Sequence, residues 1–271
     1  LNIKKKRIII FSEYIMNFEL EGTPICMIVE EGKKKNQVIC VENDESRVNH
    51  PFKTFNCKPN QKIQPLPDVS QERTIIYVTG MSGSGKSYYC KNFSDQYRKL
   101  YKDREIFLFS ALAEDKGSID KVKGLKRVKI HQEGFLAEDI KTSDFKDSLC
   151  IFDDCEAIQD KVLRKKIANI QNSILTTGRH HNISCVVTSH CATNGHETKI
   201  ILNEAHQIVL FPNGVGQRSL KYVLEGYFGL DKAQIKKIKN TRDSRWVSIL
   251  KTYPMCVLNE REAYLLNRDE D

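Results

Sequence analysis

A glycine-rich loop lies between an apolar run and a helix-compatible segment, and it limits the possible folds of this chain more than any other part of the sequence. The run Ile75 to Thr79 leads into Gly80-Met-Ser-Gly-Ser-Gly-Lys86-Ser87, and Tyr88 to Leu100 suits a helix. The spacing matches G-x-x-x-x-G-K-S in full, in the strand–loop–helix context that the motif requires. In such a loop the glycines let successive backbone N–H groups point at phosphates, and the helix N-terminus adds positive potential. The sequence therefore predicts a P-loop, a site for nucleotide phosphates.

The residue types of the loop assign the roles within it. We expect Lys86 to reach the β- and γ-phosphates and the hydroxyl of Ser87 to bind Mg²⁺. ATP and Mg²⁺ are the predicted ligands. The predicted nucleotide contacts are Gly80, Ser82, Gly83, Ser84, Gly85, Lys86, Ser87 and Tyr88.

A second apolar run ends in two carboxylates. Leu149 to Phe152 is followed by Asp153 and Asp154, which is the Walker B pattern of an acidic metal partner at the end of a neighbouring strand. We expect Asp153 to hold Mg²⁺ and Asp154 to polarise the attacking water. Glu156, two residues further on, can reach the site if the turn is tight, and it stays the alternative to Asp154.

A third run, Ser184 to Thr188, ends in Ser189 and His190. In additional-strand P-loop ATPases a polar side chain at this point senses the γ-phosphate, so either residue is a candidate sensor, the alternative being a surface histidine. Several histidines and a cysteine lie near this strand, but their spacing matches no zinc-ligand pattern, so zinc is not predicted. They are His180, His181, His190, Cys191 and His196.

Phosphoryl transfer also needs a cation that offsets developing charge, the role of an arginine finger. Arg179 follows Gly178 at a predicted helix end and can face the site of an adjacent subunit. Arg245 precedes a late strand and is the second candidate. The lysine-rich stretches at 121–129 and 232–239 are more typical of solvated faces than of DNA contacts.

The pattern around these motifs predicts an α/β fold. From Thr74 onward, strand-length apolar runs alternate with helix-length segments, which is typical of a mainly parallel sheet flanked by helices. The further predicted elements are strands at Glu105 to Phe109, Gln207 to Leu210, and around Trp246 to Leu250, Cys256 to Leu258 and Tyr264 to Leu266, a helix carrying Val162, Leu163, Ile167, Ile170 and Ile174 and capped by Gly178, and a lysine-rich helix from Asp231.

The first seventy residues predict a separate, β-rich module. Two apolar stretches, Ile25 to Val29 and Gln37 to Val41, flank a polar segment and indicate a hairpin. Prolines then crowd a stretch with little periodicity, so a linker is expected at about Asn60 to Ser70. We therefore predict a small module with its linker over 1–70 and a P-loop ATPase domain over 71–271.

Composition narrows the class further. With 271 residues and 40% hydrophobic residues, the chain can bury a substantial core. Its longest apolar run is of strand length, so no membrane span is predicted. The nine cysteines include no C-x-x-C pair, and together with the lack of a signal-peptide pattern they favour an intracellular, reduced protein. The net charge of +8 permits a nucleic-acid partner without requiring one.

Three segments together resemble a known family. They are Gly80 to Ser87, Phe152-Asp153-Asp154, and Gly178-Arg-His-His-Asn-Ile-Ser184 leading into Val187 to His190. They resemble the genome-packaging ATPases of large DNA viruses, a poxvirus-type branch of the FtsK/HerA superfamily, over roughly Thr74 to Leu210. The resemblance implies a RecA-like core, ATP hydrolysis with Mg²⁺, a homo-oligomeric ring, and double-stranded DNA moved into a capsid. It also implies capsid or portal partners and a location in the host cytoplasm or viral factory, or with the virion. The family often has Gln where Ser189 and His190 stand.

Other classes of P-loop protein fit less well. A kinase needs an arginine-rich lid, and none is evident. A GTPase needs an Asn-Lys-x-Asp guanine reader and an ABC-type ATPase a Ser-Gly-Gly signature, and the sequence has neither. The prediction is an ATP-hydrolysing DNA translocase whose catalytic residues are Lys86, Asp154, Glu156, Arg179 and His190. A P-loop kinase and a nucleotide-dependent assembly protein remain the alternatives.

Overall fold

Six parallel strands form the centre of the protein, in a computed structural model that describes residues 23–32, 36–41, 54–68, 72–114, 119–251 and 255–266. They lie side by side in the order β10-β5-β9-β8-β6-β7, and four antiparallel strands, β11, β12, β13 and β3, extend the sheet beyond β10. The strands of this sheet are β3 (Thr54–Asn56), β5 (Ile75–Thr79), β6 (Glu105–Ser110), β7 (Leu125–Arg127), β8 (Ser148–Asp153), β9 (Ser184–Ser189), β10 (Gln207–Leu210), β11 (Val247–Leu250), β12 (Cys256–Asn259) and β13 (Glu262–Leu265). The predicted α/β fold with a mainly parallel sheet, the RecA-like P-loop NTPase class, is confirmed.

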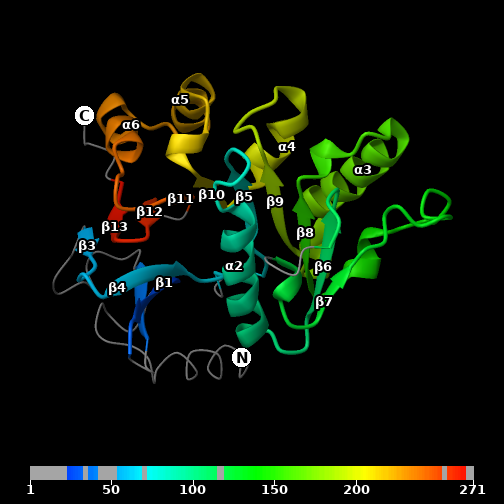
Figure 1. Ribbon diagram of the computed structural model, residues 1–271, viewed down its shortest axis with the longest axis horizontal. Helices are drawn as coiled ribbons and strands as arrows, with labels where there is room; N and C mark the ends of the chain where they lie inside the picture. Colours follow the sequence, from blue (N-terminus) through cyan, green and yellow to red (C-terminus); the bar gives the residue numbers. More distant parts are fainter. Residues whose placement is uncertain are drawn as a thin grey trace.

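Helices cover both faces of this sheet (Figure 1). Side chains of β5 alternate between two cores: Ile75 and Tyr77 pack with helices α3 to α6, and Ile76 and Val78 pack with α2. Because every residue of β5 is buried, the strand is a continuous apolar run, as a strand covered on both faces must be. The helices are α2 (Lys86–Leu100), α3 (Lys161–Thr177), α4 (His196–Glu204), α5 (Gln217–Gly226) and α6 (Lys232–Lys239), with short 3₁₀ turns at η2 (Ile119–Lys121), η3 (Thr142–Phe145), η4 (Cys155–Ala157), η5 (Gly178–His181) and η6 (Pro212–Gly214).

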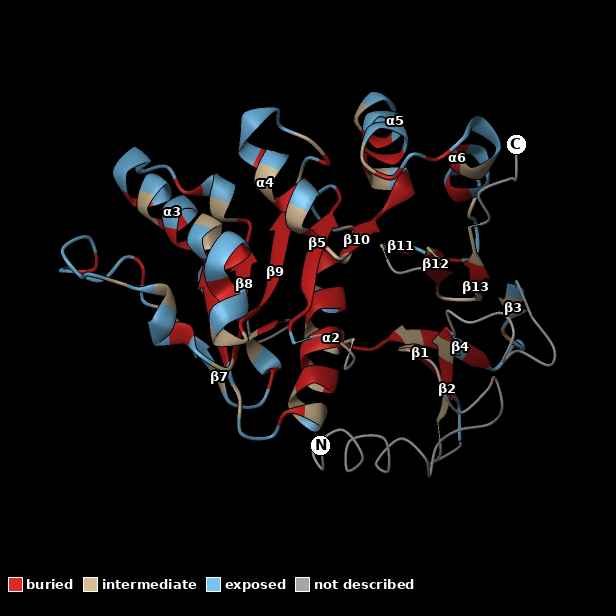
Figure 2. Ribbon diagram, turned by 180° about the vertical axis from the view of Figure 1, so that it is seen from behind, coloured by how far each residue is buried: buried red, intermediate tan, exposed pale blue. Residues whose placement is uncertain are grey.

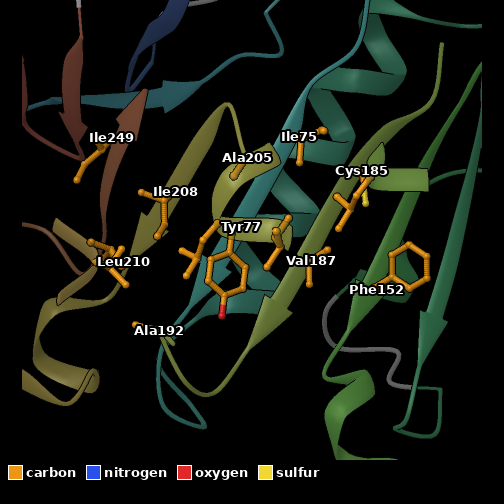
Figure 3. Packing of buried hydrophobic residues seen from close by; sticks show 14 of the residues in the cluster. Ile75, Tyr77, Phe152, Cys185, Val187, Ala192, Ala205, Ile208, Leu210 and Ile249 are labelled. Carbon is orange, nitrogen blue, oxygen red and sulfur yellow. The ribbon is translucent and has the colours of Figure 1, made fainter. Parts of the chain in front are cut away.

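The face under α3 to α6 is close-packed. Figure 3 shows Tyr77 between Val187 on β9 and Ile208 and Leu210 on β10. The Tyr77 hydroxyl donates a hydrogen bond of 2.6 Å to the carbonyl oxygen of Cys191, so this buried aromatic has a polar partner. The contact ties the centre of the sheet to the loop after β9.

The N-terminal segment forms a second, smaller sheet. β1 (Thr23–Glu30) pairs antiparallel with β2 (Gln37–Val41), which confirms the predicted hairpin, and with β4 (Gln61–Pro65). Part of the linker predicted over Asn60 to Ser70 is therefore wrong, because Gln61–Pro65 form the strand β4. Pro65 is compatible with β4 because β4 is an edge strand, where a missing N–H donor on the outer side costs no ladder bond.

This small sheet shares a core with the rest of the chain. Ile25 and Cys26 of β1 belong to the same buried cluster as Tyr89 of α2 and Leu258 of β12. β3 lies between the small-sheet strands in sequence, yet it pairs with β13 at the edge of the large sheet. The division into domains at residue 70 stays a prediction.

The helix ends follow from local chemistry. The Asp160 side chain caps α3 by accepting hydrogen bonds from Val162 N and Leu163 N, and Asp231 caps α6 in the same way. Gly178 follows the last residue of α3, as predicted, while Val162 lies on the exposed side of this helix. Helices α4 and α5 were not predicted. In the described part of the chain, no helix combines the length and the hydropathy needed to cross a bilayer.

Candidate functional site

The P-loop leaves the carboxyl end of β5 and enters α2 with a backbone that only glycine adopts easily. Gly83 has φ +74° and Gly85 φ +113°, both in the left-handed region. A Cβ on Gly80 would lie 2.7 Å from Ser84 Oγ and 2.9 Å from Phe211 Cβ, so a larger residue cannot occupy this position without displacing its neighbours. These positions fix the path of the loop and leave space at Gly83, where an added Cβ meets nothing within 4 Å.

Backbone N–H groups of the loop donate to the end of β9 and to the turn η6, and these hydrogen bonds hold the loop in place. Gly80 N donates to Ser189 O at 3.2 Å, and Met81 N donates to Gly214 O at 3.0 Å. Two hydroxyls, those of Thr79 at the end of β5 and Ser84 within the loop, are buried and have no hydrogen-bond partner in the described structure. Because buried polar groups are normally paired, such hydroxyls fit a loop built to receive a polar ligand. The remaining predicted contacts lie at its surface, with Ser82 exposed, Ser87 half-buried and Tyr88 exposed.

Lys86 is a buried cation at the start of α2. Its ammonium donates to Gly80 O at 2.9 Å, and it lies 3.3 Å from His190 Nδ1 and 3.7 Å from Asp154 Oδ1. A buried ammonium needs such partners. The structure thus brings the predicted phosphate-binding lysine together with residues from β8 and β9.

The two predicted carboxylates meet at a shared hydroxyl. Thr188 Oγ1 lies 2.9 Å from Asp153 Oδ1 and 3.1 Å from Asp154 Oδ1, and it accepts a hydrogen bond of 2.9 Å from Asp154 N. Asp154 has φ +48°, an uncommon conformation for a residue with a Cβ. Burial and the neighbouring Asp154 carboxylate raise the pKa of Asp153. A divalent cation at this carboxyl would offset both causes.

Glu156 and His190 complete the arrangement. One Glu156 oxygen accepts hydrogen bonds from Ser189 Oγ at 3.0 Å and His190 N at 2.7 Å. His190 Nε2 lies 3.2 Å from Asp154 Oδ2. Because an ammonium can only donate, His190 Nδ1 accepts from Lys86 and its Nε2–H faces Asp154. Of the two carboxylates, Asp154 contacts Lys86, while Glu156 accepts from Ser189 and the His190 amide.

Potential metal-ligand atoms of Asp154, Glu156 and His190 lie within 4.8 Å of one another. The Lys86 ammonium already lies against two of the three, so a cation compensates this cluster without a metal. Of the histidines weighed for zinc, His190 is the one in this group of described residues.

Arg179 lies far from this site within its own chain. Thr79 at the carboxyl end of β5 pairs with Ser189, and Ile75 at its amino end pairs with Cys185, so the turn at Arg179, just before β9, is at the opposite edge of the sheet. The α3 helix that leads to this turn has 17 residues, about 25 Å. The Arg179 side chain is exposed and lies 4.0 Å from Glu72. It can reach a P-loop only in another copy of the chain.

Arg245 lies at the same edge of the sheet as the P-loop. It precedes β11, whose first residue, Val247, pairs with Leu210 at the carboxyl end of β10. Its side chain is exposed, and two strands separate β11 from β9. The structure brings neither arginine into contact with Lys86.

A virophage protein is similar to most of this chain. The uncharacterized protein V3 of Sputnik virophage is 39% identical over 211 residues, which are 77% of this chain and 83% of the relative. The chain belongs to the family of this virophage protein. No protein-family model matches the chain.

Similar solved structures include viral packaging enzymes. The DNA-packaging ATPase B204 of Sulfolobus turreted icosahedral virus is 16% identical, with a TM-score of 0.48, over 69% of this chain and 97% of that one. The genome packaging NTPase B204 of Sulfolobus turreted icosahedral virus 2, solved with ATP-gammaS, is 14% identical, with a TM-score of 0.46, over 70% and 97%. Identities and TM-scores this low give no information on the substrate or the partners of this chain. The virophage relative is a viral protein, as the resemblance in the sequence predicts.

Sequence reasoning missed two residues that shape the site of this family member. Thr188 joins both aspartates, and its only signal was a polar side chain next to the end of a buried strand. Phe211, which an added Cβ on Gly80 or Gly85 would contact, follows β10 and had no signal in the sequence. Both depend on which strands become neighbours.

Proposed function

We propose that the chain is an ATP-hydrolysing DNA translocase that packages viral double-stranded genomic DNA into capsids. The observation that carries the proposal is the position of Lys86, which is buried in the P-loop and lies 3.7 Å from Asp154, directly after the Walker B strand β8. A P-loop lysine beside two strand-end carboxylates is the arrangement used for nucleotide hydrolysis. The viral relative supports a role in a viral life cycle.

Each residue of the site has a task in this proposal. The backbone N–H groups from Gly83 to Ser87 bind phosphate oxygens, and Lys86 leaves Gly80 O to donate to them. Ser87 and Asp153 would hold Mg²⁺, which neutralises phosphate charge when bound. The donor types, a hydroxyl and a carboxylate, suit this hard cation.

Asp154 orients the attacking water and accepts its proton. The Asp154 carboxylate is suited to this because Thr188 and His190 hold its two oxygens in a defined direction. Glu156 is engaged by Ser189 and the His190 amide, so we assign it the task of holding the end of β9. His190, in contact with both Lys86 and Asp154, is placed to sense whether a γ-phosphate is bound.

The proposal extends to assembly. Since Arg179 lies at the far edge of the sheet from its own P-loop, a finger role requires a neighbouring copy, as in a homo-oligomeric ring. Double-stranded DNA is the proposed cargo, capsid or portal proteins are the proposed partners, and the host cytoplasm or viral factory is the proposed place of action.

Displacement of a third strand from a DNA triplex tests translocation. We expect the wild-type chain to displace the third strand with ATP and Mg²⁺ but not with a non-hydrolysable analogue. The Asp154→Asn variant should bind ATP but leave the third strand in place. ATP turnover without displacement, or phosphate transfer to a small acceptor, would contradict translocation and favour an assembly protein or a kinase.

A further inference from the structure

Most of the surplus positive charge of the chain lies in a single connection of the sheet. Residues 217–245 hold eight basic and three acidic residues, while the whole chain has a net charge of +8. They form α5, α6 and the loop between β10 and β11. Five of the eight surplus charges are therefore concentrated in about a tenth of the chain.

Three of these cations form a stripe on α6. Lys232, Lys236 and Lys239 recur at i, i+4 and i+7, which places them on one side of a helix, and all three are exposed. Ile235 and Ile238 fix the orientation of the helix by packing into the core. No hydrogen bond or ion pair ties the three lysine side chains to any residue that the structure describes.

Lys237 on the same helix differs from the three stripe lysines because its side chain has partners within the fold. Its ammonium lies 3.2 Å from Glu262 and 3.4 Å from the centre of the Tyr264 ring. Lys237 therefore anchors α6 to β13. The stripe lysines have no such task in the fold.

Helix electrostatics do not account for the stripe either. Cations stabilise the C-terminal turn of a helix and are disfavoured in the first turn. Lys236 and Lys239 lie in the last turn, but Lys232 is the first residue of α6, directly after the Asp231 cap. The stripe thus runs the length of the helix, at a small cost to helix stability at its start.

More exposed groups lie on the segments next to α6. Arg242 and Arg245 follow α6 on the way to β11, and both are exposed. On the adjoining helix α5, Tyr222 is 56% exposed and contacts Tyr227 edge to face at 5.9 Å. Figure 2 shows the outward sides of both helices as exposed surface.

The same connection contacts the P-loop at its start. Phe211 lies against Gly80, and Gly214 O accepts the hydrogen bond from Met81 N. A Cβ on Gly214 would lie 2.7 Å from Met81 Cγ, so the two loops are closely packed. A shift of the P-loop on nucleotide binding would therefore be passed to the segment that carries the stripe.

We propose that the stripe of Lys232, Lys236 and Lys239, with Arg242 and Arg245 beside it, binds the phosphates of double-stranded DNA. The inference rests on the proposed function and names the surface through which the cargo is held. The stripe spans about 10 Å along the helix, which matches the rise of about three phosphates on one strand of B-DNA. Flexible ammonium groups without base-reading partners predict binding with little sequence preference.

The test compares two variants of equal net charge, in each of which three lysines are replaced by glutamine. The first carries Lys232→Gln, Lys236→Gln and Lys239→Gln. The matched control carries Lys99→Gln, Lys102→Gln and Lys123→Gln, which are exposed lysines around the C-terminal end of α2, at the opposite edge of the sheet. Binding of a short fluorescein-labelled duplex is measured by anisotropy at several salt concentrations, without nucleotide.

We expect the α6 variant to bind at least about tenfold more weakly, and the slope of log K against log salt to fall in magnitude by about 3, since each lost phosphate contact removes about 0.9. The control should keep the wild-type affinity and slope. An α6 variant with unchanged affinity and slope overturns the inference while the DNA role stands. A wild-type chain that binds no duplex but hydrolyses ATP overturns both. A variant that changes only the oligomeric state, seen by analytical ultracentrifugation, assigns the surface to subunit contact and also overturns the proposal.

Discussion

The two edges of the central sheet use polar groups in opposite ways. At the amino edge the Arg73 guanidinium donates to the carbonyl oxygens of Ile174 and Leu175, each at 2.8 Å. Thr74 N donates to Ser184 Oγ at 3.1 Å, and Ile75 N donates to His206 Nδ1 at 3.3 Å. These groups satisfy one another, so this edge serves the fold.

At the carboxyl edge polar groups are buried without being fully paired within the protein. The Thr79 and Ser84 hydroxyls are buried without a partner, and Asp153 and Asp154 lie side by side next to the buried Lys86. Such an arrangement costs stability in the ligand-free protein. Polar groups at the amino edge therefore hold the sheet together, while those at the carboxyl edge lie where open α/β sheets bind their ligands.

The largest expected effect separates activity from stability at the carboxyl edge. Asp153→Asn should lower kcat for ATP hydrolysis by about 10³-fold, because it removes a charge that would hold Mg²⁺. In the presence of EDTA the same variant should have a higher free energy of unfolding at neutral pH, since the wild type buries a second carboxylate beside Asp154.

The sign follows from the raised pKa of Asp153. A carboxyl whose pKa is raised on folding favours the native state below its ordinary value of 3.8, and this stability is lost as the pH rises through the higher folded-state pKa. Urea denaturation at several pH values checks it. A variant less stable than the wild type at pH 7 would contradict the account of this edge.

A substitution at the amino edge, Arg73→Met, should lower stability without affecting ATP binding. Arg73→Met leaves two buried carbonyl oxygens of α3 without their charged donor, so we expect the free energy of unfolding to fall by about 3 kcal/mol. The affinity for ATP should stay within about twofold of the wild type at a temperature where the variant is folded. Denaturation and calorimetric titration measure the two quantities.

Arg179→Ala is the matched control at the same edge. Its side chain is 74% exposed, so the free energy of unfolding should change by less than about 0.5 kcal/mol. If Arg179 acts in a neighbouring copy, hydrolysis should fall by about 10³-fold although stability is kept. Full activity in this variant would exclude it as the finger.

A smaller effect is expected where one hydroxyl joins the two aspartates. Thr188→Val keeps the shape of the side chain but removes the acceptor of Asp154 N and the donor to both carboxylates. We expect kcat to fall about tenfold and the free energy of unfolding by about 1 to 2 kcal/mol. Thr188→Ser, which restores the hydroxyl, should recover most of the activity; failure to do so would mean that the methyl group matters more than the hydrogen bonds.

The smallest expected effect is a pH dependence at the amino edge. Burial and the nearby Arg73 lower the pKa of His206, so the folded state favours the neutral ring. Its contribution to stability is present above the ordinary value of 6.5 and is lost as the pH falls through the lower folded-state pKa. In the His206→Gln variant the free energy of unfolding should decrease less between pH 7 and pH 5 than in the wild type, by about 1 kcal/mol or less. Thermal unfolding at several pH values measures this difference.

The carboxyl edge could be predicted from the sequence better than the rest of the molecule. The glycine spacing and the buried runs of β5, β8 and β9 are local signals. They are sufficient to predict the sheet and to place Lys86 and the two aspartates at one edge of it, while the roles of these residues stay predictions. The edge strand β4 was missed because Pro65 was interpreted as a breaker, although the ladder it joins leaves its N–H side unpaired. The distance of Arg179 from the P-loop and the role of Thr188 depend on tertiary neighbours, which no local pattern encodes.

The most direct test of the account is steady-state ATP hydrolysis by the purified wild-type chain and by Lys86→Ala, each with Mg²⁺ and with or without double-stranded DNA. We expect the wild type to hydrolyse ATP at a rate that DNA increases, and Lys86→Ala to lose at least about 10²-fold of this activity. Equal turnover in the two proteins would contradict it, because hydrolysis would then arise somewhere other than the P-loop edge of the sheet.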